Sequence, residues 1–202
     1  MAMEKQCSKQ PRRRLPRAAR EEQISAAALQ VFREHGYNGA SISQIATLAG
    51  LADGALYRFY GSKKEILESA LCRWYERVLE SYEAALKAID DPGLRLRYAI
   101  RHNIHCICED ASISSLYYEL RRDRGFKGSR LVEYNKKYIS ILLKILKEMR
   151  GSHGKSDIKI TTISRVIYAA IEMGTERFRI HQEALDQEAL TNEILKVARR
   201  LI

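Results

Sequence analysis

Four side chains able to bind a metal ion lie close together in the second half of the chain. His102, His105, Cys106 and Glu109 recur at intervals that place them on one face of a single helix. Imidazole, thiolate and carboxylate groups are all ligands of zinc and nickel. One helix rarely supplies a whole tetrahedral site, however, and the neighbouring charged residues indicate a partly solvated helix. Three interpretations therefore stay open: a metal site, histidines that line a ligand pocket, and ordinary packing.

No catalytic motif accompanies this cluster, since the chain lacks a G-x-S-x-G elbow, a P-loop and an H-E-x-x-H zinc motif. We therefore expect no enzymatic activity and no bound cofactor. The four cysteines form neither a C-x-x-C pair nor a disulfide framework, which predicts a reducing, cytoplasmic environment. No apolar run reaches the roughly 18 residues of a membrane-spanning helix, and the N-terminus lacks the apolar segment of a secretory signal.

Positive charge is concentrated near the N-terminus. The 202 residues carry a net charge of +10, and residues 1–64 hold +6 of it, with 11 Lys and Arg against 5 Asp and Glu. A concentrated basic region attracts nucleic acid or an anionic membrane, although a merely solvated basic surface has the same composition. Residues 1–16 are predicted to form a disordered basic tail that either contacts DNA or serves only as a solubilising leader.

Hydrophobic spacing predicts helices throughout, with no period-two alternation that would indicate a strand. Helices are expected over residues 17–36, from Ser41 to Gly50, over 53–60, and from residue 63 onward. Two short helices joined at a glycine and supported by a preceding helix are typical of a helix-turn-helix, whose second helix enters the major groove of DNA. Tyr57, Arg58 and Phe59, predicted to be exposed, favour this interpretation over an ordinary three-helix bundle.

Three segments follow a known pattern. Residues 32–37 (FREHGY), 41–50 (SISQIATLAG) and 54–65 (GALYRFYGSKKE) resemble the DNA-binding domain of the TetR family of one-component transcriptional regulators, over residues 20–67. The resemblance implies an all-α protein of about nine helices. It predicts a helix-turn-helix DNA-binding domain of three helices at 17–64, after the tail at 1–16, and a larger helical domain at 65–202 that binds a ligand and dimerises.

The resemblance also implies which side chains meet DNA. Contacts to phosphate are expected from Ser41, Tyr57 and Lys63. Contacts to base edges or the groove are expected from Ser43, Gln44, Asp53, Gly54, Ala55 and Arg58. An Arg can bind guanine, and a Gln can bind adenine, through paired hydrogen bonds. Two positions depart from the family pattern: Phe59 lacks a polar group, and Ala52 replaces the usual Ser cap, so that Asp53 either caps the recognition helix or contacts cytosine.

Two C-terminal helices are predicted at 157–180 and 187–201. The first is apolar on more than one side and contains small residues that allow close helix contact. The resemblance implies that this pair forms a dimer interface, although the core of a single protomer would show the same pattern. The predicted interface residues are Ile163, Val166, Ile167, Ala170, Ile171, Gly174, Ile194, Ala198 and Leu201.

A cavity for a small-molecule inducer is implied as well. The residues that could line an apolar pocket with a few polar groups are Trp74, Tyr98, His102, Cys106, Tyr117, Tyr118, Tyr138 and Tyr168. Each of them could also be a core or surface residue, and the sequence does not identify the ligand.

Together these observations predict a homodimeric regulator of transcription that binds a palindromic operator and no membrane. The expected mechanism is repression, which an inducer relieves by swinging the helix that begins at residue 63 and so changing the distance between the two DNA-binding domains. Activation stays open, because the position of the operator decides it. Two alternatives are a metal-responsive regulator or ligand-binding protein that uses the His102 helix face, and a basic protein that binds DNA without specificity.

Overall fold

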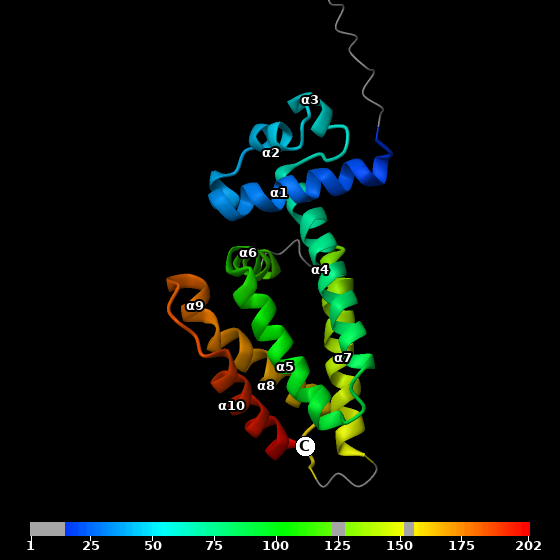
Figure 1. Ribbon diagram of the computed structural model, residues 1–202, viewed down its shortest axis with the longest axis vertical. Coiled ribbons are helices and arrows are strands. Elements are labelled where there is room, and N and C mark those ends of the chain that lie inside the picture. The colour runs from blue at the N-terminus through cyan, green and yellow to red at the C-terminus, as the bar shows by residue number, and fades with distance from the viewer. Residues whose placement is uncertain (1–14, 123–127, 152–155) are drawn as a thin grey trace, which may run out of the picture.

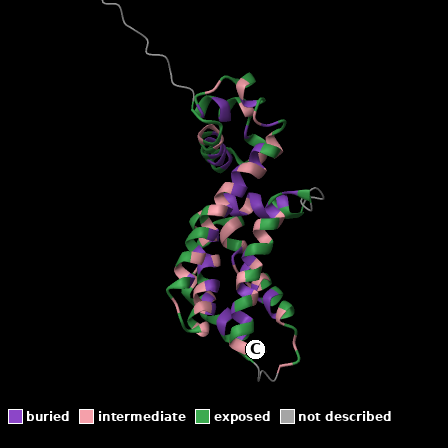
Figure 2. Cartoon of the chain, turned by 90° about the vertical axis from the view of Figure 1, so that its right-hand side faces the viewer, coloured by how far each residue is buried: buried purple, intermediate pink, exposed green. Residues whose placement is uncertain are grey.

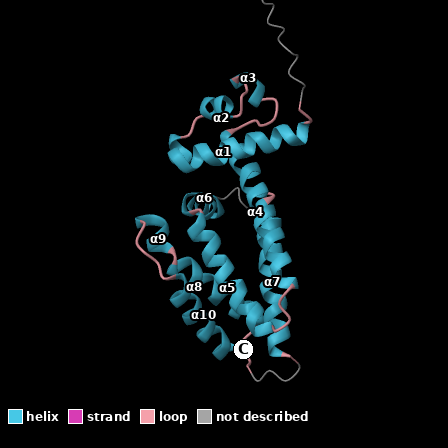
Figure 3. Ribbon diagram, in the orientation of Figure 1, coloured by secondary structure: helices cyan, strands magenta, loops and turns pink. Residues whose placement is uncertain are grey.

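The computed structural model describes residues 15–122, 128–151 and 156–202, so residues 1–14 of the predicted tail lie outside the described residues. The described residues form ten α-helices and no strand (Figure 1; Figure 3), which confirms the all-α prediction with one helix more than expected. The helices are α1 (Arg17–Gly39), α2 (Ile42–Leu48), α3 (Asp53–Leu56), α4 (Lys63–Lys87), α5 (Pro92–Glu109), α6 (Ala111–Arg122), α7 (Leu131–Arg150), α8 (Ile160–Gly174), α9 (Glu176–His181) and α10 (Gln187–Leu201).

The first three helices form a small head at one end of the molecule (Figure 1). Along α1, Ile24, Ala28 and Phe32 recur at four-residue intervals and are fully buried in the core of the head. The regular helix is interrupted at Gly36, whose φ of 64° and ψ of 179° only glycine adopts readily. The chain therefore turns at Gly36 before it enters α2, at the position where the sequence predicted the end of the helix.

Helix α4 joins the head to the rest of the molecule, which we call the body (α5–α10 with most of α4). Ser62 starts the helix, since its hydroxyl oxygen accepts from the backbone N–H of Glu65 at 3.1 Å. The helix then runs for 25 residues, packing first on α1 and later on α5 and α7 (Figure 1). The domain boundary predicted at residues 64 and 65 therefore falls inside a continuous helix.

Helix α5 is the central helix of the body, where it packs against α4, α6, α7, α8 and α10. Large aromatic side chains fill the space around it, among them the buried Tyr75, Tyr82 and Tyr138. Buried residues face inward along these helices and exposed residues face outward (Figure 2). Within the described ranges, no helix combines the length and apolar character needed to cross a membrane.

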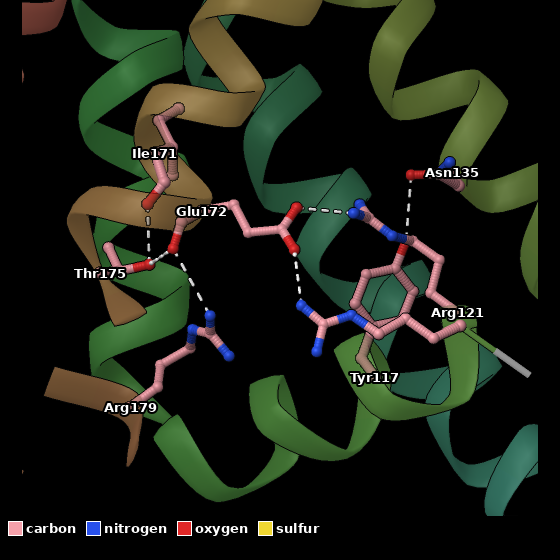
Figure 4. A network of polar contacts seen from close by, with 8 residues as sticks. Tyr117, Arg121, Asn135, Ile171, Glu172, Thr175 and Arg179 are labelled. Carbon is pink, nitrogen blue, oxygen red and sulfur yellow. Dashed lines mark hydrogen bonds and ion pairs between the residues drawn. The ribbon is translucent and has the colours of Figure 1, made fainter. Parts of the chain in front are cut away.

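Two predicted helix boundaries were wrong. The helix expected over 157–180 is divided into α8 and α9 at Thr175, whose hydroxyl donates to the carbonyl oxygen of Ile171 at 2.8 Å (Figure 4). The helix expected over 53–60 ends at Leu56 and continues as a turn. In both cases hydrogen bonds local to the helix end compete with the regular pattern, which the hydrophobic spacing alone does not reveal.

Candidate DNA interface and effector cleft

Helices α2 and α3 form a helix-turn-helix. Gly50, with a φ of 62°, makes the turn, and the N–H of Leu51 donates to the carbonyl oxygen of Ala46 at 2.8 Å. Ile45, Ala46 and Leu56 are fully buried, which fixes the two short helices on the core of the head. Helices this short do not form alone, so their orientation depends on this packing.

The surface of α3 and of the turn after it presents the groups best placed to meet DNA. Gly54, Tyr57 and Arg58 are exposed, and Tyr57 keeps 57% of its surface accessible. Ala55 is only half-buried. Phe59, predicted to be exposed, is half-buried instead, with the Arg17 guanidinium 5.9 Å from the centre of its ring. Tyr57 can donate its hydroxyl to a phosphate, and Arg58 can bind a base edge.

Ser41 and Gln44 form a capping box at the start of α2. The Ser41 hydroxyl oxygen accepts from the backbone N–H of Gln44 at 3.1 Å. The Gln44 side-chain oxygen in turn accepts from the backbone N–H and the hydroxyl of Ser41 at 2.8 and 2.9 Å. The paired contact of Gln44 with adenine does not fit this geometry, because the side-chain oxygen of Gln44 already accepts two hydrogen bonds from Ser41. Gln44 offers DNA only its amide N–H groups.

Lys63, predicted to contact phosphate, lies half-buried within the head. Its ammonium donates to the carbonyl oxygens of Tyr37 and Ala40, at 2.7 and 2.9 Å, and lies 4.6 Å from the centre of the Tyr37 ring. These contacts hold the connection between α1 and α2 against the start of α4. The expected phosphate contact of Lys63 is therefore not available in this structure.

Asp53 does not cap the recognition helix, so that prediction was wrong. Ala52 precedes α3 without a side-chain cap, and Asp53 is the first residue of the helix. The Asp53 carboxylate accepts from the hydroxyl of Ser43, which links α3 to α2. Because Ser43 and Asp53 bind each other, Arg58 is the strongest remaining candidate for a contact to a base.

A cleft of about 690 Å³ opens on the side of the body that adjoins the head. Helix α4 supplies Trp74, Arg77, Val78 and Ser81, and α5 supplies Tyr98, His102, His105, Cys106 and Glu109. Asp110 follows α5, and Arg33 reaches the cleft from α1. Aromatic and aliphatic side chains together with two guanidinium groups suit a ligand that has an apolar part and an anionic part.

His102 lies at the inner wall of the cleft as a neutral side chain. Its ring packs 4.7 Å from the ring of Tyr82, and Nδ1 lies 3.2 Å from the hydroxyl of Tyr138. Burial, with the nearby imidazole of His105 as a second cause, lowers the pKa of His102 to about 4. At neutral pH this residue can exchange a hydrogen bond with a ligand but offers no charge.

The four candidate metal ligands do not form a metal site. Burial, followed by the charge of Glu109, raises the pKa of the Cys106 thiol to about 12, so the thiolate form is disfavoured. His105 and Glu109 lie on the exposed side of the helix, 3.8 Å apart, while His102 is turned toward Tyr138. In the part of the chain that the structure describes, no group of three or more His, Cys, Asp or Glu side chains could hold a metal ion.

The eight residues predicted to line one pocket divide among three places. Trp74, Tyr98, His102 and Cys106 line the cleft. Tyr117, Tyr118 and Tyr138 line an adjoining void of about 40 Å³, which shares Trp74, Val78 and Cys106 with the cleft. Tyr168 lines a separate groove of about 440 Å³ with residues of α7 and α8.

Arg33, Arg77 and Asp110 line the cleft although the sequence did not predict them there. Exposed charged residues on helices are common, so nothing in the local pattern marks these three. Arg33 and Asp110 bind each other although 77 positions separate them.

The predicted dimer interface is mostly the core of a single chain. Ile163, Ile167, Ile171, Ile194 and Ala198 are buried within the protomer, so they leave almost no surface for contact with a second subunit. A Cβ added at Gly174 would lie 2.7 Å from a methyl carbon of Leu190, so this glycine allows α8 and α10 of the same chain to pack closely. Ala170 and Leu201 are half-buried. Val166 is the one exposed residue of the predicted set. Met173 of α8 and Val197 of α10, which were not predicted to lie in the interface, are exposed as well.

Similar proteins share this architecture. Residues 24–70 match the family model described as bacterial regulatory proteins, tetR family. The fatty acid metabolism regulator protein of Bacillus subtilis (strain 168) is 26% identical over 177 residues, which cover 87% of this chain and 91% of that protein. The HTH-type transcriptional activator FasR of Mycolicibacterium smegmatis is 33% identical over 106 residues, 52% of this chain and 48% of that protein.

A solved structure of the transcriptional regulator FadR from Bacillus subtilis in complex with stearoyl-CoA has a TM-score of 0.77 at 26% identity, over 90% of this chain and 98% of that chain. A helix-turn-helix head joined to an all-helical body defines a DNA-binding regulator of transcription. The head of this chain therefore matches the DNA-binding domain of the tetR family of bacterial regulatory proteins, and the chain as a whole is similar to the B. subtilis regulators named above.

Proposed function

We propose that this chain is a transcriptional regulator whose affinity for its operator falls when a fatty acyl-CoA binds in the cleft. The observation that carries the proposal is that head and body both line the cleft, the head through Arg33 and the body through α4 and α5. A ligand there contacts both parts, so its affinity can differ between two orientations of the head. The class of effector is supported by the name of the B. subtilis relative, a fatty acid metabolism regulator, and by the solved structure of B. subtilis FadR with stearoyl-CoA.

The chemistry of the cleft fits an acyl-CoA. Guanidinium groups such as those of Arg33 and Arg77 bind phosphate through paired, charge-assisted hydrogen bonds. Trp74, Val78 and Tyr98 give an apolar wall. The adjoining void of about 40 Å³ is too small for a long acyl chain, so the tail can enter only if the shared wall at Trp74 moves. We therefore expect the body to rearrange when the tail enters.

We further propose that two copies associate through the outer faces of α8 and α10 and place their two heads on a palindromic operator. In this arrangement Tyr57 binds a phosphate, Ser41 can bind another once its hydroxyl leaves the Gln44 side-chain oxygen, and Arg58 binds a base edge in the major groove. Bound at a promoter, the dimer blocks transcription until the acyl-CoA releases it. The metal-responsive alternative has no support in the described residues.

The test is a fluorescence anisotropy titration with DNA from upstream of the chain's own gene and with a scrambled fragment of equal length. We expect at least about 10³-fold tighter binding to the upstream DNA. Stearoyl-CoA should weaken that binding, whereas coenzyme A without its acyl chain should have little effect. Similar affinity for both fragments would identify a non-specific DNA-binding protein, and no response to stearoyl-CoA would refute the proposed effector.

A further inference from the structure

An ion pair on the wall of the cleft joins the head to the body. Arg33 of α1 donates from Nε and Nη2 to Oδ2 of Asp110, at 2.8 and 2.6 Å. The Asp110 side chain is 13% exposed, and its other oxygen, Oδ1, accepts from the backbone N–H of Ile113 at 3.3 Å, in the first turn of α6. One carboxylate therefore binds α1 with one oxygen and caps α6 with the other.

The far end of α6 is fixed to the body. Arg121 donates to a carboxylate oxygen of Glu172 in α8 at 2.6 Å, and Arg122 lies 3.5 Å from the other oxygen of Glu172. Figure 4 shows this contact next to the bond between the Tyr117 hydroxyl and Asn135 of α7, which measures 3.0 Å. Because α6 is held at its C-terminal end, breaking the bond between Arg33 and Asp110 would remove the ion pair between α1 and the start of α6 and leave α6 in place.

The cleft holds a second guanidinium, that of Arg77, which has no partner among the residues that the structure describes. Arg77 of α4 is exposed and makes no hydrogen bond or ion pair with any residue in the described ranges. Arg33, which lines the same cleft, is already bound to Asp110. An anionic group that enters the cleft therefore meets one unpaired cation, and it competes with the Asp110 carboxylate for the Nε and Nη2 donors of a second.

We propose that Arg33 and Arg77 bind the anionic group of the effector, and that this binding takes Arg33 from Asp110 and so uncouples the head from the body. The inference rests on the proposed effector cleft and adds the contact that transmits occupancy to the DNA-binding helices. The anionic group is a phosphate of the coenzyme or, if the effector is a free fatty acid, its carboxylate. Because Asp110 and the effector compete for one guanidinium, removing the charge of Asp110 must tighten effector binding, whereas removing Arg33 must weaken it.

Calorimetric titrations of the full chain with stearoyl-CoA, stearate and coenzyme A test this opposition. We expect Asp110→Asn, which keeps the oxygen that caps α6, to bind stearoyl-CoA about three- to tenfold more tightly. Arg33→Gln and Arg77→Gln should bind it more weakly by a similar factor. Arg95→Gln is the matched control, since it breaks an ion pair of 2.8 Å with Glu148 outside the cleft and should change nothing. The same pattern with coenzyme A indicates a phosphate, and with stearate a carboxylate.

Operator binding without effector provides a second measurement. Asp110→Asn and Arg33→Gln should each lower operator affinity about threefold or more, and the double variant should lose no more than one of them, since both act through one contact. If the wild-type chain binds none of the three probes, the proposed effector is wrong. The operator affinities of the two single variants and the double variant then decide by themselves whether the ion pair holds the head on the body. If the chain binds stearoyl-CoA but both variants shift its affinity in the same direction, the competition is refuted and the effector stands.

Discussion

Polar side chains inside the body are kept uncharged by their surroundings. Burial lowers the pKa of His102 to about 4 and raises the pKa of the Cys106 thiol to about 12. The same cause raises the pKa of the Tyr138 hydroxyl well above its usual range. The inner wall of the cleft therefore carries no charge at neutral pH, and Arg33 and Arg77 are the lining arginines that can form an ion pair with an anionic ligand.

The buried imidazole predicts a pH dependence of stability. Because the pKa of His102 is lowered on folding, the unfolded chain takes up a proton first as the pH falls from about 6.5 toward 4. The free energy of unfolding should therefore decrease over this window, by up to about 3 kcal/mol from this residue. Urea unfolding at several pH values should show a smaller decrease for His102→Gln than for the wild type. His181→Gln, at an exposed position, should leave the dependence unchanged.

Lys63 gives a prediction that separates a structural role from a DNA contact. Lys63→Met removes two charge-assisted hydrogen bonds to the carbonyl oxygens of Tyr37 and Ala40, so the free energy of unfolding should fall by about 1–3 kcal/mol. Urea denaturation without DNA measures this loss. An unchanged stability, together with a shallower salt dependence of operator binding, would contradict it and restore the phosphate contact.

At the scale of the element, the backbone at Gly36 interrupts the regular helix of α1. A side chain at a φ of 64° and a ψ of 179° is strained even though nothing lies within 4 Å of the added Cβ. We expect Gly36→Ala to lower the melting temperature, with a cost of about 1–3 kcal/mol. Gly39→Ala is the matched control, because its Cβ would meet only a side-chain carbon of His35 at 3.5 Å. Equal effects of the two substitutions would show that the conformation of Gly36 is not the cause.

Local pattern predicted those features that depend on neighbours in sequence. The caps at Ser41 and Ser62 and the turn at Gly50 follow from residue type and hydrophobic spacing. Contacts between distant segments were not predictable in this way. The bond between Arg33 and Asp110 depends on how α1 packs over α6. The ammonium of Lys63 donates to backbone carbonyl oxygens of a distant segment and does not extend into solvent.

The burial of Ile163 and Ile167 within a single protomer was not predictable for a related physical reason. An apolar helix face is buried in either case, and its spacing does not say whether the covering helix belongs to the same chain or to a partner. Here α10 and α7 of the same chain pack on α8, and both isoleucines are buried without a second subunit.

At the scale of the whole molecule, the outer faces of α8 and α10 leave large apolar side chains in solvent. Met173 is 64% exposed and Val197 48% exposed. If these faces form the proposed dimer interface, the double variant Met173→Glu, Val197→Glu should be a monomer in light-scattering chromatography and should lose operator affinity. Leu94→Glu, which changes an exposed leucine of α5, should remain dimeric. A double variant that keeps the mass of the wild-type dimer would place the interface elsewhere.

The uninterrupted course of α4 has a mechanical consequence. A helix of 25 residues spans about 37 Å, so a pivot of only about 5° at one end displaces the other by about 3 Å, the length of a hydrogen bond. Trp74 and Arg77 lie partway along α4, and Lys63 is its first residue. Any ligand that tilts α4 by a few degrees can displace its N-terminal end, whatever the chemical class of the ligand. The wall of the cleft can therefore diverge toward new ligands in evolution while the head and its operator stay the same.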